Sequence, residues 1–246
     1  MNFPSKHSLL CENVGYTIIS NNRLIQALEM TQPTAIEPAF DRLLQVAVEV
    51  FAECGFREAT VREICSRANV NVASVNYYFR SKEALYTQAL AFAFREANRL
   101  YPQNAILDKG LPPEQRLTLF IGNFLHKLLD DSHFGLHSKL IAREIAAPTK
   151  ALDEIIETAI VPQFALLVEI IQQILGTPAE KVIVQRCLLS IFGQCLMFKH
   201  SRSIIDRLYP ELIANDSAIQ ASADHIAQFS LAALARFAQQ KERLTP

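Results

Sequence analysis

Hydrophobic residues recur three or four positions apart along most of the chain, which is the spacing of one face of an α-helix. The pattern is regular from Ala39 to Cys54. Gly55 follows it, and glycine ends helices readily because it adopts positive φ without a Cβ clash. Further stretches with this spacing predict helices over about 60–68, 71–78, 82–101, 112–130, 134–147, 150–175, 179–200 and 216–242. No strand-like alternation and no fixed-period repeat interrupts them, so the sequence predicts an all-α protein.

Polar residues predict where the short helices begin and stop. Thr60 is placed to cap the second helix, and Glu63 three residues later completes a capping box. Asn69 falls where the turn requires a left-handed backbone conformation, and Asn adopts this conformation more readily than most non-glycine residues. Asn71 and Ser81 are placed to cap the third and fourth helices. Two short helices joined by so tight a turn predict a helix-turn-helix, which inserts its second helix into the DNA major groove.

The first 37 residues lack a sustained helical period and mix polar residues with short apolar patches. We interpret them as a flexible N-terminal extension. Three interpretations of this segment are open: an arm that touches DNA, an untethered tail, and a stretch that precedes a true start at Met30. Lys6 and Arg23 alone supply little positive charge for a DNA-binding arm, which favours the last two interpretations.

Composition narrows the class of protein. The chain has 246 residues, half of them hydrophobic, and a formal net charge of −1, so it can bury a sizeable core and carries no polybasic arm. Its five cysteines include no Cys-x-x-Cys pair and mostly fall within apolar helical patterns, which predicts buried free thiols and a reducing cytoplasm. We expect no bilayer-spanning apolar run and no secretory signal.

Charged and reactive residue types constrain the function. Between Arg57 and Lys82 there are five basic and two acidic residues, an excess of three positive charges that suits DNA and equally a solvated helix face. Ser, His and acidic residues are scattered, without a nucleophile elbow, a Gly-rich phosphate loop or paired carboxylates. We therefore expect no catalytic residues and no cofactor. A helical protein-interaction module without sequence-specific DNA binding is the alternative function, because long helices alone would suit it.

Two stretches carry a family resemblance. Ala47–Tyr86, AVEVFAECGFREATVREICSRANVNVASVNYYFRSKEALY, resembles the DNA-binding domain of TetR-type bacterial repressors. Ala142–Phe164, AREIAAPTKALDEIIETAIVPQF, resembles the C-terminal domain of the CecR-like branch of that family. The resemblance implies a helix-turn-helix DNA-binding domain at 38–85 and a helical effector-binding and dimerisation domain at 86–246. Two departures are Asn69, where Gly is usual, and Asn76, where many members carry Tyr.

The third helix is the expected recognition helix. Val75 and Phe79 stand four apart and are expected to pack inward. The outer face then carries the expected DNA contacts, which are Val72, Ala73, Ser74, Asn76, Tyr77 and Tyr78. Small residues at 72–74 permit close approach to a thymine methyl, Ser74 and Asn76 suit base edges, and the two tyrosines reach phosphates. A surface polar role for Asn76 and a core position for Tyr77 are the alternatives.

Three residues outside that helix are also expected to contact DNA. Arg62 resembles a position from which family members reach a base or a phosphate, although a solvated helix residue would look the same. Thr60 and Lys82 lie at helix N-termini, where backbone N–H groups and positive charge favour phosphate.

A single helix-turn-helix covers little DNA, so a homodimer is expected to read a palindrome with half-sites about 34 Å apart. Helices 179–200 and 216–242 are the expected dimer interface, because their apolar arcs are wider than one intramolecular neighbour needs. A helix buried centrally in its own chain would show the same arc.

A small-molecule effector is expected among helices 112–175. The residues expected to line its pocket are Phe120, Phe124, Phe164, His126, His137 and Arg143. Core positions for the phenylalanines and surface positions for the histidines are the simpler alternative. His133 and His137 stand four apart, but no Cys, Asp or Glu with ligand spacing accompanies them, so no metal is expected. The resemblance implies that effector binding releases a repressor from DNA through a shift of the helix at 82–101.

Overall fold

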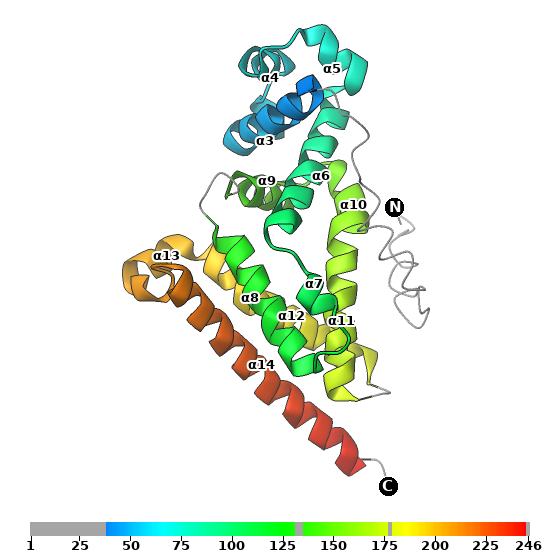
Figure 1. Ribbon diagram of the computed structural model, residues 1–246, viewed down its shortest axis with the longest axis vertical. Coiled ribbons are helices and arrows are strands. Elements are labelled where there is room, and N and C mark those ends of the chain that lie inside the picture. The colour runs from blue at the N-terminus through cyan, green and yellow to red at the C-terminus, as the bar shows by residue number, and fades with distance from the viewer. Residues whose placement is uncertain (1–37, 131–134, 177–178, 245–246) are drawn as a thin grey trace, which may run out of the picture. The chain divides into compact units, whose positions relative to one another are not determined.

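The computed structural model describes residues 38–130, 135–176 and 179–244, and every regular element within these ranges is helical (Figure 1). The predicted all-α class is confirmed. The head consists of α3 (Pro38–Glu58), α4 (Val61–Ala68) and α5 (Val72–Tyr78), and α6 (Lys82–Leu100) follows it. The later elements are α7 (Asn104–Leu107), α8 (Pro113–Leu129), α9 (Gly135–Ala146), α10 (Ala151–Ile155), the π-helical turn η1 (Ile156–Ile160), α11 (Val161–Leu175), α12 (Lys181–His200), α13 (Arg202–Leu208), the 3-10 turn η2 (Pro210–Leu212) and α14 (Asp216–Leu244). The predicted N-terminal extension lies outside the described residues.

The head is held together by an apolar core that its three helices share with α6, α9 and α10. Ala47 and Phe51 of α3 and Ile64 of α4 are fully buried. Val75 and Phe79, in and after α5, are 1% and 5% exposed, so their predicted inward packing is confirmed. α5 has only seven residues, too few to form a stable helix alone, and these contacts therefore fix its orientation.

The predicted helix caps are confirmed, because each cap side chain accepts a hydrogen bond from a backbone N–H. The Glu63 N–H donates to Thr60 Oγ1 (3.1 Å), the Ala73 N–H to Asn71 Oδ1 (2.9 Å) and the Ala84 N–H to Ser81 Oγ (3.1 Å). A capping box has two hydrogen bonds, and the described residues form the one from the Glu63 N–H to Thr60 Oγ1 but not the one from the Thr60 N–H to the Glu63 side chain. The Glu63 carboxylate accepts a hydrogen bond from Arg67 Nη2 at 2.7 Å.

Two residues with positive φ set the turns of the head. Asn69 has φ 52° and ends α4, as predicted for a turn that requires a left-handed residue. Gly55 has φ 81° and breaks the helical path near the end of α3. A Cβ at Gly55 would also lie 3.3 Å from Arg143 Nη1, so a larger residue there would be both strained and crowded.

A second apolar core lies among α8, α11, α12 and α14, and aromatic rings fill its centre. The ring centroid of Phe192 lies 4.6 Å from that of Phe164, 5.0 Å from that of Phe124 and 5.9 Å from that of Phe120. Two of these pairs are edge-on and one is stacked, which are arrangements that aromatic rings favour.

Polar contacts of α9 tie it to α6 and to the head. Glu144 of α9 is 1% exposed and accepts hydrogen bonds from the Tyr86 hydroxyl of α6 (2.8 Å) and the Thr149 backbone N–H (2.7 Å). Burial and the Glu144 carboxylate raise the pKa of Tyr86 far above its ordinary value, so the hydroxyl stays protonated. Arg143 Nη2 donates to the Glu53 carbonyl oxygen at 2.9 Å. α9 is therefore bonded to both α6 and α3.

Residues 150–175, predicted as one helix, form α10, η1 and α11 in direct succession. The span is correct, but the expectation of uniform α-helical geometry is wrong. Pro162 follows the π-helical turn, lacks an N–H, and would crowd the carbonyl of Thr158 in a regular α-helix. The wider π-helical turn accommodates the proline.

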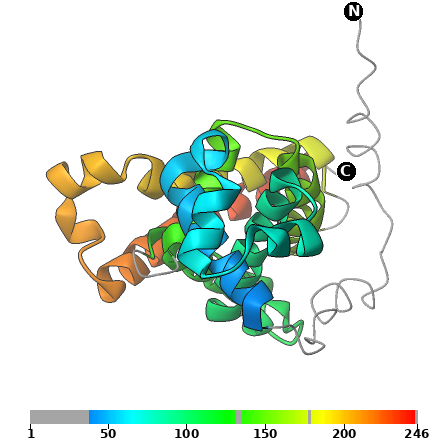
Figure 2. The same cartoon turned by 90° about the horizontal axis from the view of Figure 1, so that it is seen from above.

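The expectation that no apolar stretch is long enough to span a bilayer is wrong for α12. Its length and its mean hydropathy of 1.4 are those of a helix able to cross a bilayer. Core helices of soluble proteins meet the same criteria, and Val184, Ile191 and Phe192 pack one face of α12 into the second core. After α12, the unpredicted elements α13 and η2 project to one side of the described helices (Figures 1 and 2).

Three of the four described cysteines are small buried hydrophobic residues, as predicted, and Cys54 is half-buried. Cys65, Cys187 and Cys195 are buried and none of them forms a disulfide. Burial raises the pKa of the Cys195 thiol to about 12, so it stays protonated and unreactive. Cys11 lies outside the described residues.

Candidate nucleic-acid interface

α5 presents one face to the head core and the other to solvent. Val72 is 44% exposed and Tyr77 is 79% exposed, and Ala73 and Asn76 are exposed beside them. Ser74 is half-buried. Exposure excludes the alternative that Tyr77 is a core residue. The predicted outward positions therefore form a continuous face, and their contact with DNA stays a prediction.

Tyr78 departs from this pattern. It is half-buried, and its ring centroid lies 5.6 Å from that of Phe40 in α3 and 4.9 Å from that of Tyr77. It follows the buried Val75 by three positions, which turns its ring toward α3. Its ring therefore supports α5 from the edge of the core, and the predicted contact of its hydroxyl with a phosphate stays a prediction.

The basic residues of the head divide into paired and unpaired groups. Arg67 is neutralised by Glu53 at 2.8 Å and Glu63 at 2.7 Å, so it adds little to the local positive charge. Arg62 and Arg80 are exposed and form no ion pair with the other residues that the structure describes. These two guanidinium groups, near the ends of α4 and α5, remain available to phosphates.

Arg80 is a candidate DNA contact that sequence reasoning did not select. It follows α5 by two positions and has φ 66°, a left-handed conformation that costs a non-glycine residue about 1 kcal/mol. Its N–H donates to the Val75 carbonyl at 3.1 Å, which fixes the exit from α5. The available signal was its position, since Arg80 is the basic residue that directly follows the recognition helix.

Lys82 is attached to the last turn of α3. Its Nζ donates to the Arg57 carbonyl at 3.1 Å and lies 4.8 Å from the centroid of the Phe56 ring. Its charge therefore sits beside the segment that leads into Thr60, the N-cap of α4. A helix N-terminus with an ammonium group nearby is a favourable environment for a phosphate.

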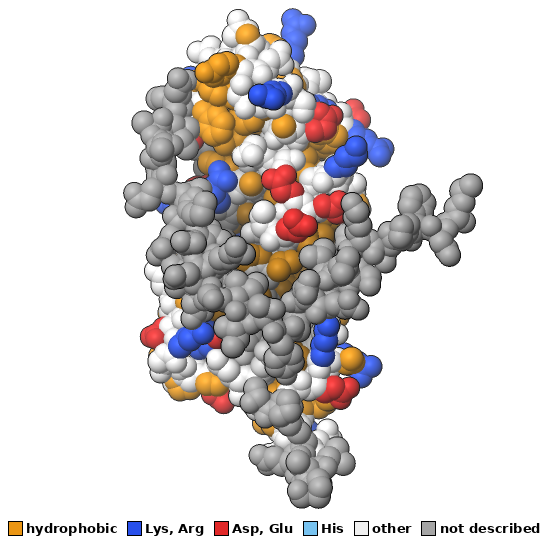
Figure 3. Space-filling model, turned by 90° about the vertical axis from the view of Figure 1, so that its right-hand side faces the viewer, with side chains coloured by type: hydrophobic (Ala, Val, Ile, Leu, Met, Phe, Trp, Pro, Cys, Tyr) orange, Lys and Arg blue, Asp and Glu red, His pale blue; other side chains and the backbone are white. Residues whose placement is uncertain are grey.

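The distribution of charge on one face of the molecule fits this arrangement. In Figure 3, Lys and Arg side chains (blue) stand at the top of the head, and Asp and Glu side chains (red) lie both beside and below them. Phosphate groups therefore meet a more favourable potential at the end that carries α5.

The residues expected to line an effector pocket do not gather around one cavity. Phe120, Phe124 and Phe164 form the aromatic centre of the second core. Arg143 contacts the end of α3, and His126 alone of the described candidates lines a cavity of about 340 Å³. The spacing of the phenylalanines reflected core packing, because a 2% exposed ring such as that of Phe120 has no room for a ligand beside it.

The histidine pair considered for a metal is not tested by the structure. His133 and the side chain of His137 lie outside the described residues. Within the described ranges, no group of three or more His, Cys, Asp or Glu side chains is arranged to hold a metal ion.

The head and the helices behind it define a class of protein, helix-turn-helix DNA-binding proteins with a second helical domain. Comparison with known families agrees on both parts. Residues 43–89 match the family described as bacterial regulatory proteins, tetR family, and residues 113–234 match the C-terminal domain of the HTH-type transcriptional dual regulator CecR. The chain is 30% identical to that CecR regulator from Shigella flexneri over 178 residues, covering 69% of this chain and 79% of the relative.

Solved structures show the same fold. A putative transcriptional regulator from Pseudomonas aeruginosa PAO1 aligns with a TM-score of 0.63 at 19% identity, over 83% of this chain and 97% of that one. FadR from Bacillus subtilis, solved with stearoyl-CoA, aligns with a TM-score of 0.59 at 18% identity, over 78% of this chain and 97% of that one. The chain belongs to the TetR family of transcriptional regulators, in the branch with a CecR-type C-terminal domain.

Proposed function

We propose that this regulator is a homodimeric repressor that binds a palindromic operator in the cytoplasm and leaves it when a small-molecule effector binds. The observation that carries the DNA-binding part is the exposed face of α5, flanked by the unpaired guanidinium groups of Arg62 and Arg80. Tyr77 is 79% exposed on this face, so its ring and hydroxyl can reach DNA.

The side chains divide into base-reading and phosphate-binding roles. Asn76 is an amide that suits the edge of an adenine, and Val72 suits a thymine methyl group. Tyr77, Arg62, Arg80, and the N-terminus of α4 with Lys82 suit phosphates, which position the protein without reading sequence. With so few polar base contacts, sequence selectivity also depends on DNA shape and on a second head.

The outward faces of α12 and α14 support dimerisation. Each helix buries one side in its own core, yet α12 exposes Leu189 at 63% and Met197 at 56%, and α14 exposes Phe229 at 62% and Phe237 at 41%. Large apolar side chains exposed on neighbouring helices mark an interface. A second copy packed on this surface would bury it and set the separation of two heads.

An effector releases the DNA only if it binds more tightly to a dimer whose head spacing does not fit the operator than to one whose spacing does. α9 is the natural transmitter, since it is bonded to α6 through Glu144 and Tyr86 and to α3 through Arg143. A shift of α9 or α6 therefore reorients the head as a unit.

Selection of bound DNA from a random pool tests this function directly. A two-fold symmetric consensus with half-sites one duplex turn apart is the expected result. Asn76→Ala should relax the preference at one base pair in each half-site, whereas Tyr77→Phe should weaken all sequences alike. Binding without sequence preference, together with an intact dimer, would instead favour the protein-interaction module.

Salt dependence tests the phosphate contacts. Lys82→Ala should lower the slope of log Kobs against log salt by roughly 0.9 for each head, because one phosphate contact is lost. Arg99→Ala is the matched control, as Arg99 is an exposed cation of α6 at the end away from the head. Equal slopes for Lys82→Ala and the parent would contradict the phosphate role. Transcription of a reporter behind the selected operator separates repression from activation.

A further inference from the structure

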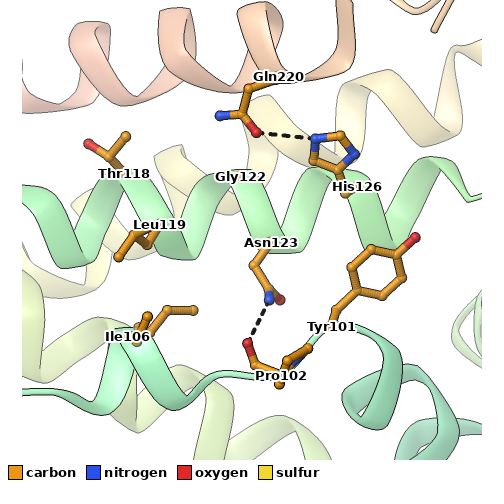
Figure 4. A pocket seen from close by; sticks show the side chains of 10 residues that line it. Tyr101, Pro102, Ile106, Thr118, Leu119, Gly122, Asn123, His126 and Gln220 are labelled. Carbon is orange, nitrogen blue, oxygen red and sulfur yellow. Dashed lines mark hydrogen bonds between the residues drawn. The ribbon is translucent and has the colours of Figure 1, made fainter. Parts of the chain in front are cut away.

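The cavity of about 340 Å³ lies between the end of α6, the short α7, the middle of α8 and the first turns of α14 (Figure 4). The side chains that give it chemical character are Tyr101, Ile106, Thr118, Asn123, His126 and Gln220. This volume is at the lower end of the range that small-molecule sites occupy in proteins.

Hydrogen bonds hold the polar wall of this cavity in one arrangement. The Gln220 amide nitrogen donates to Asp224 Oδ1 at 2.8 Å, which orients its carbonyl oxygen toward His126. His126 Nε2 lies 3.2 Å from that oxygen and is therefore the donor of this pair (Figure 4).

The wall offers the ligand acceptors more than donors. Asn123 Nδ2 donates to the Pro102 carbonyl at 3.1 Å, and Asn123 Oδ1 has no partner among the described residues. Thr118 Oγ1 donates to the Glu114 carbonyl at 3.0 Å, which leaves its lone pairs available. A ligand with a hydroxyl or N–H group would satisfy these oxygens.

The rest of the lining is apolar and uncharged. Ile106, Leu119, Ala105 and the Tyr101 ring face the same space, and no Lys, Arg, Asp or Glu lines it. A charged ligand would find no counter-ion among these lining side chains. The cavity therefore suits a neutral, largely apolar molecule.

We propose that this cavity binds a small neutral organic molecule with a hydroxyl or N–H donor, of the phenol type, and that this molecule is the effector. The effector role rests on the proposed function, whereas binding itself does not. Phenylalanine rings fill the second core, and the depression among α6, α9 and α10 has no room for a water-sized molecule. Tyr101 and Pro102 directly follow α6, so an occupant of the cavity presses on the helix that leads from the head.

Three ring compounds that differ in charge test the proposal on the full chain at pH 7. Calorimetric titration should show saturable binding of p-cresol, which is neutral, and binding at least about tenfold weaker for 4-hydroxybenzoate and tyramine, because each buries a charge. Absence of saturable p-cresol binding, or equal affinity for all three compounds, would overturn the neutral-ligand site. A chain that selects operator DNA but fails this test keeps the proposed function and loses the inference.

Two variants locate the site. Gly122→Leu places an isobutyl group in the cavity, since a Cβ there already lies 3.4 Å from Gln220 Nε2, and should abolish p-cresol binding. Gln115→Leu is the control, because Gln115 is an exposed residue of the same helix that does not line the cavity. Unchanged p-cresol affinity in Gly122→Leu would place the binding elsewhere and overturn the proposal.

Asn123→Asp keeps the shape of the wall and adds a carboxylate, so its result does not depend on the tolerance of α8 for a large side chain. The ratio of tyramine to p-cresol affinity should rise by about tenfold or more, because the new charge pairs with the ammonium group. An unchanged ratio in a folded variant would refute the role of Asn123. Loss of operator binding upon p-cresol addition, in the parent but not in Gly122→Leu, would establish the effector role; DNA binding indifferent to p-cresol would overturn it.

Discussion

Lys127 of α8 is a partly buried cation whose charge costs the protein stability. Its Nζ donates to Asn98 Oδ1 of α6 at 2.7 Å, and no carboxylate pairs with it among the described residues. Desolvation lowers the pKa of Lys127 to about 8 from 10.5. Since one pKa unit corresponds to about 1.4 kcal/mol, keeping this ammonium group charged in the folded state costs about 3 kcal/mol at most.

Lys127→Met removes that charge and preserves most of the packing of the side chain. The variant also loses the hydrogen bond to Asn98, which contributes about 1 kcal/mol. We expect a net gain of about 2 kcal/mol in the free energy of unfolding at pH 7, or about 4–8 °C in Tm for a domain of this size. Lys139→Met is the control, because Lys139 is exposed on α9 and should leave Tm nearly unchanged.

The pH dependence distinguishes this explanation from improved packing. The folded pKa of Lys127 is lowered, so below about pH 8 both folded and unfolded chains carry the charge and the full cost applies. Between about pH 8 and 10.5 the folded protein releases its proton first, and the stability of the parent rises relative to that of the variant. The pKa of Tyr101 is raised to about 12, so both proteins lose stability above pH 10. This loss is the same in parent and variant and cancels in the difference between their stabilities.

Urea unfolding at pH 7 and pH 10 measures this difference. The advantage of Lys127→Met should be about 2 kcal/mol at pH 7 and should vanish or reverse near pH 10. A variant that is less stable than the parent at pH 7, or an advantage of equal size at both pH values, would refute the reasoning.

Substitutions at three further positions probe the framework. Tyr86→Phe removes the hydroxyl that donates to Glu144, and chemical denaturation should show a loss of about 2 kcal/mol, as expected for a hydrogen bond to a charged group; an unchanged stability would contradict that bond. Arg116→Met removes a fully buried guanidinium whose Nε donates to the Ile106 carbonyl at 2.7 Å. The Tm of the variant should fall by an amount equivalent to about 2–3 kcal/mol. Retention of the parent Tm would show that the bond contributes nothing net. Asn69→Ala should cost about 1 kcal/mol and Asn69→Gly much less, because only alanine is strained at φ 52°; equal losses would argue against strain as the cause.

The sequence alone determined the local structure of the head. Thr60, Asn71 and Ser81 cap their helices, and Asn69 takes the left-handed conformation, because each of these roles depends on a few neighbouring backbone atoms. The spacing of Val75 and Phe79 also determined the outward face of α5, since a helix that buries one side must expose the other. The family resemblance at Ala47–Tyr86 belongs to this local level.

Tertiary structure decided the packing of the C-terminal domain. Phe120, Phe124 and Phe164 have a spacing that fits a pocket or a core equally well, and only the arrival of Phe192 from α12 makes them core. Arg116 reads as a surface residue in the sequence, yet it is 1% exposed. Its partners Ile106 and Gln173 lie 10 and 57 positions away, a separation that no local pattern records.

The same reason explains why the cavity was missed. His126 was selected as a polar group on α8, but its partner Gln220 is 94 positions distant on α14. Caps and helix faces follow from contacts within a few residues, which short-range backbone geometry dictates. A binding cavity depends on which distant side chains meet and what volume they leave empty, and only the packing of the whole chain decides that.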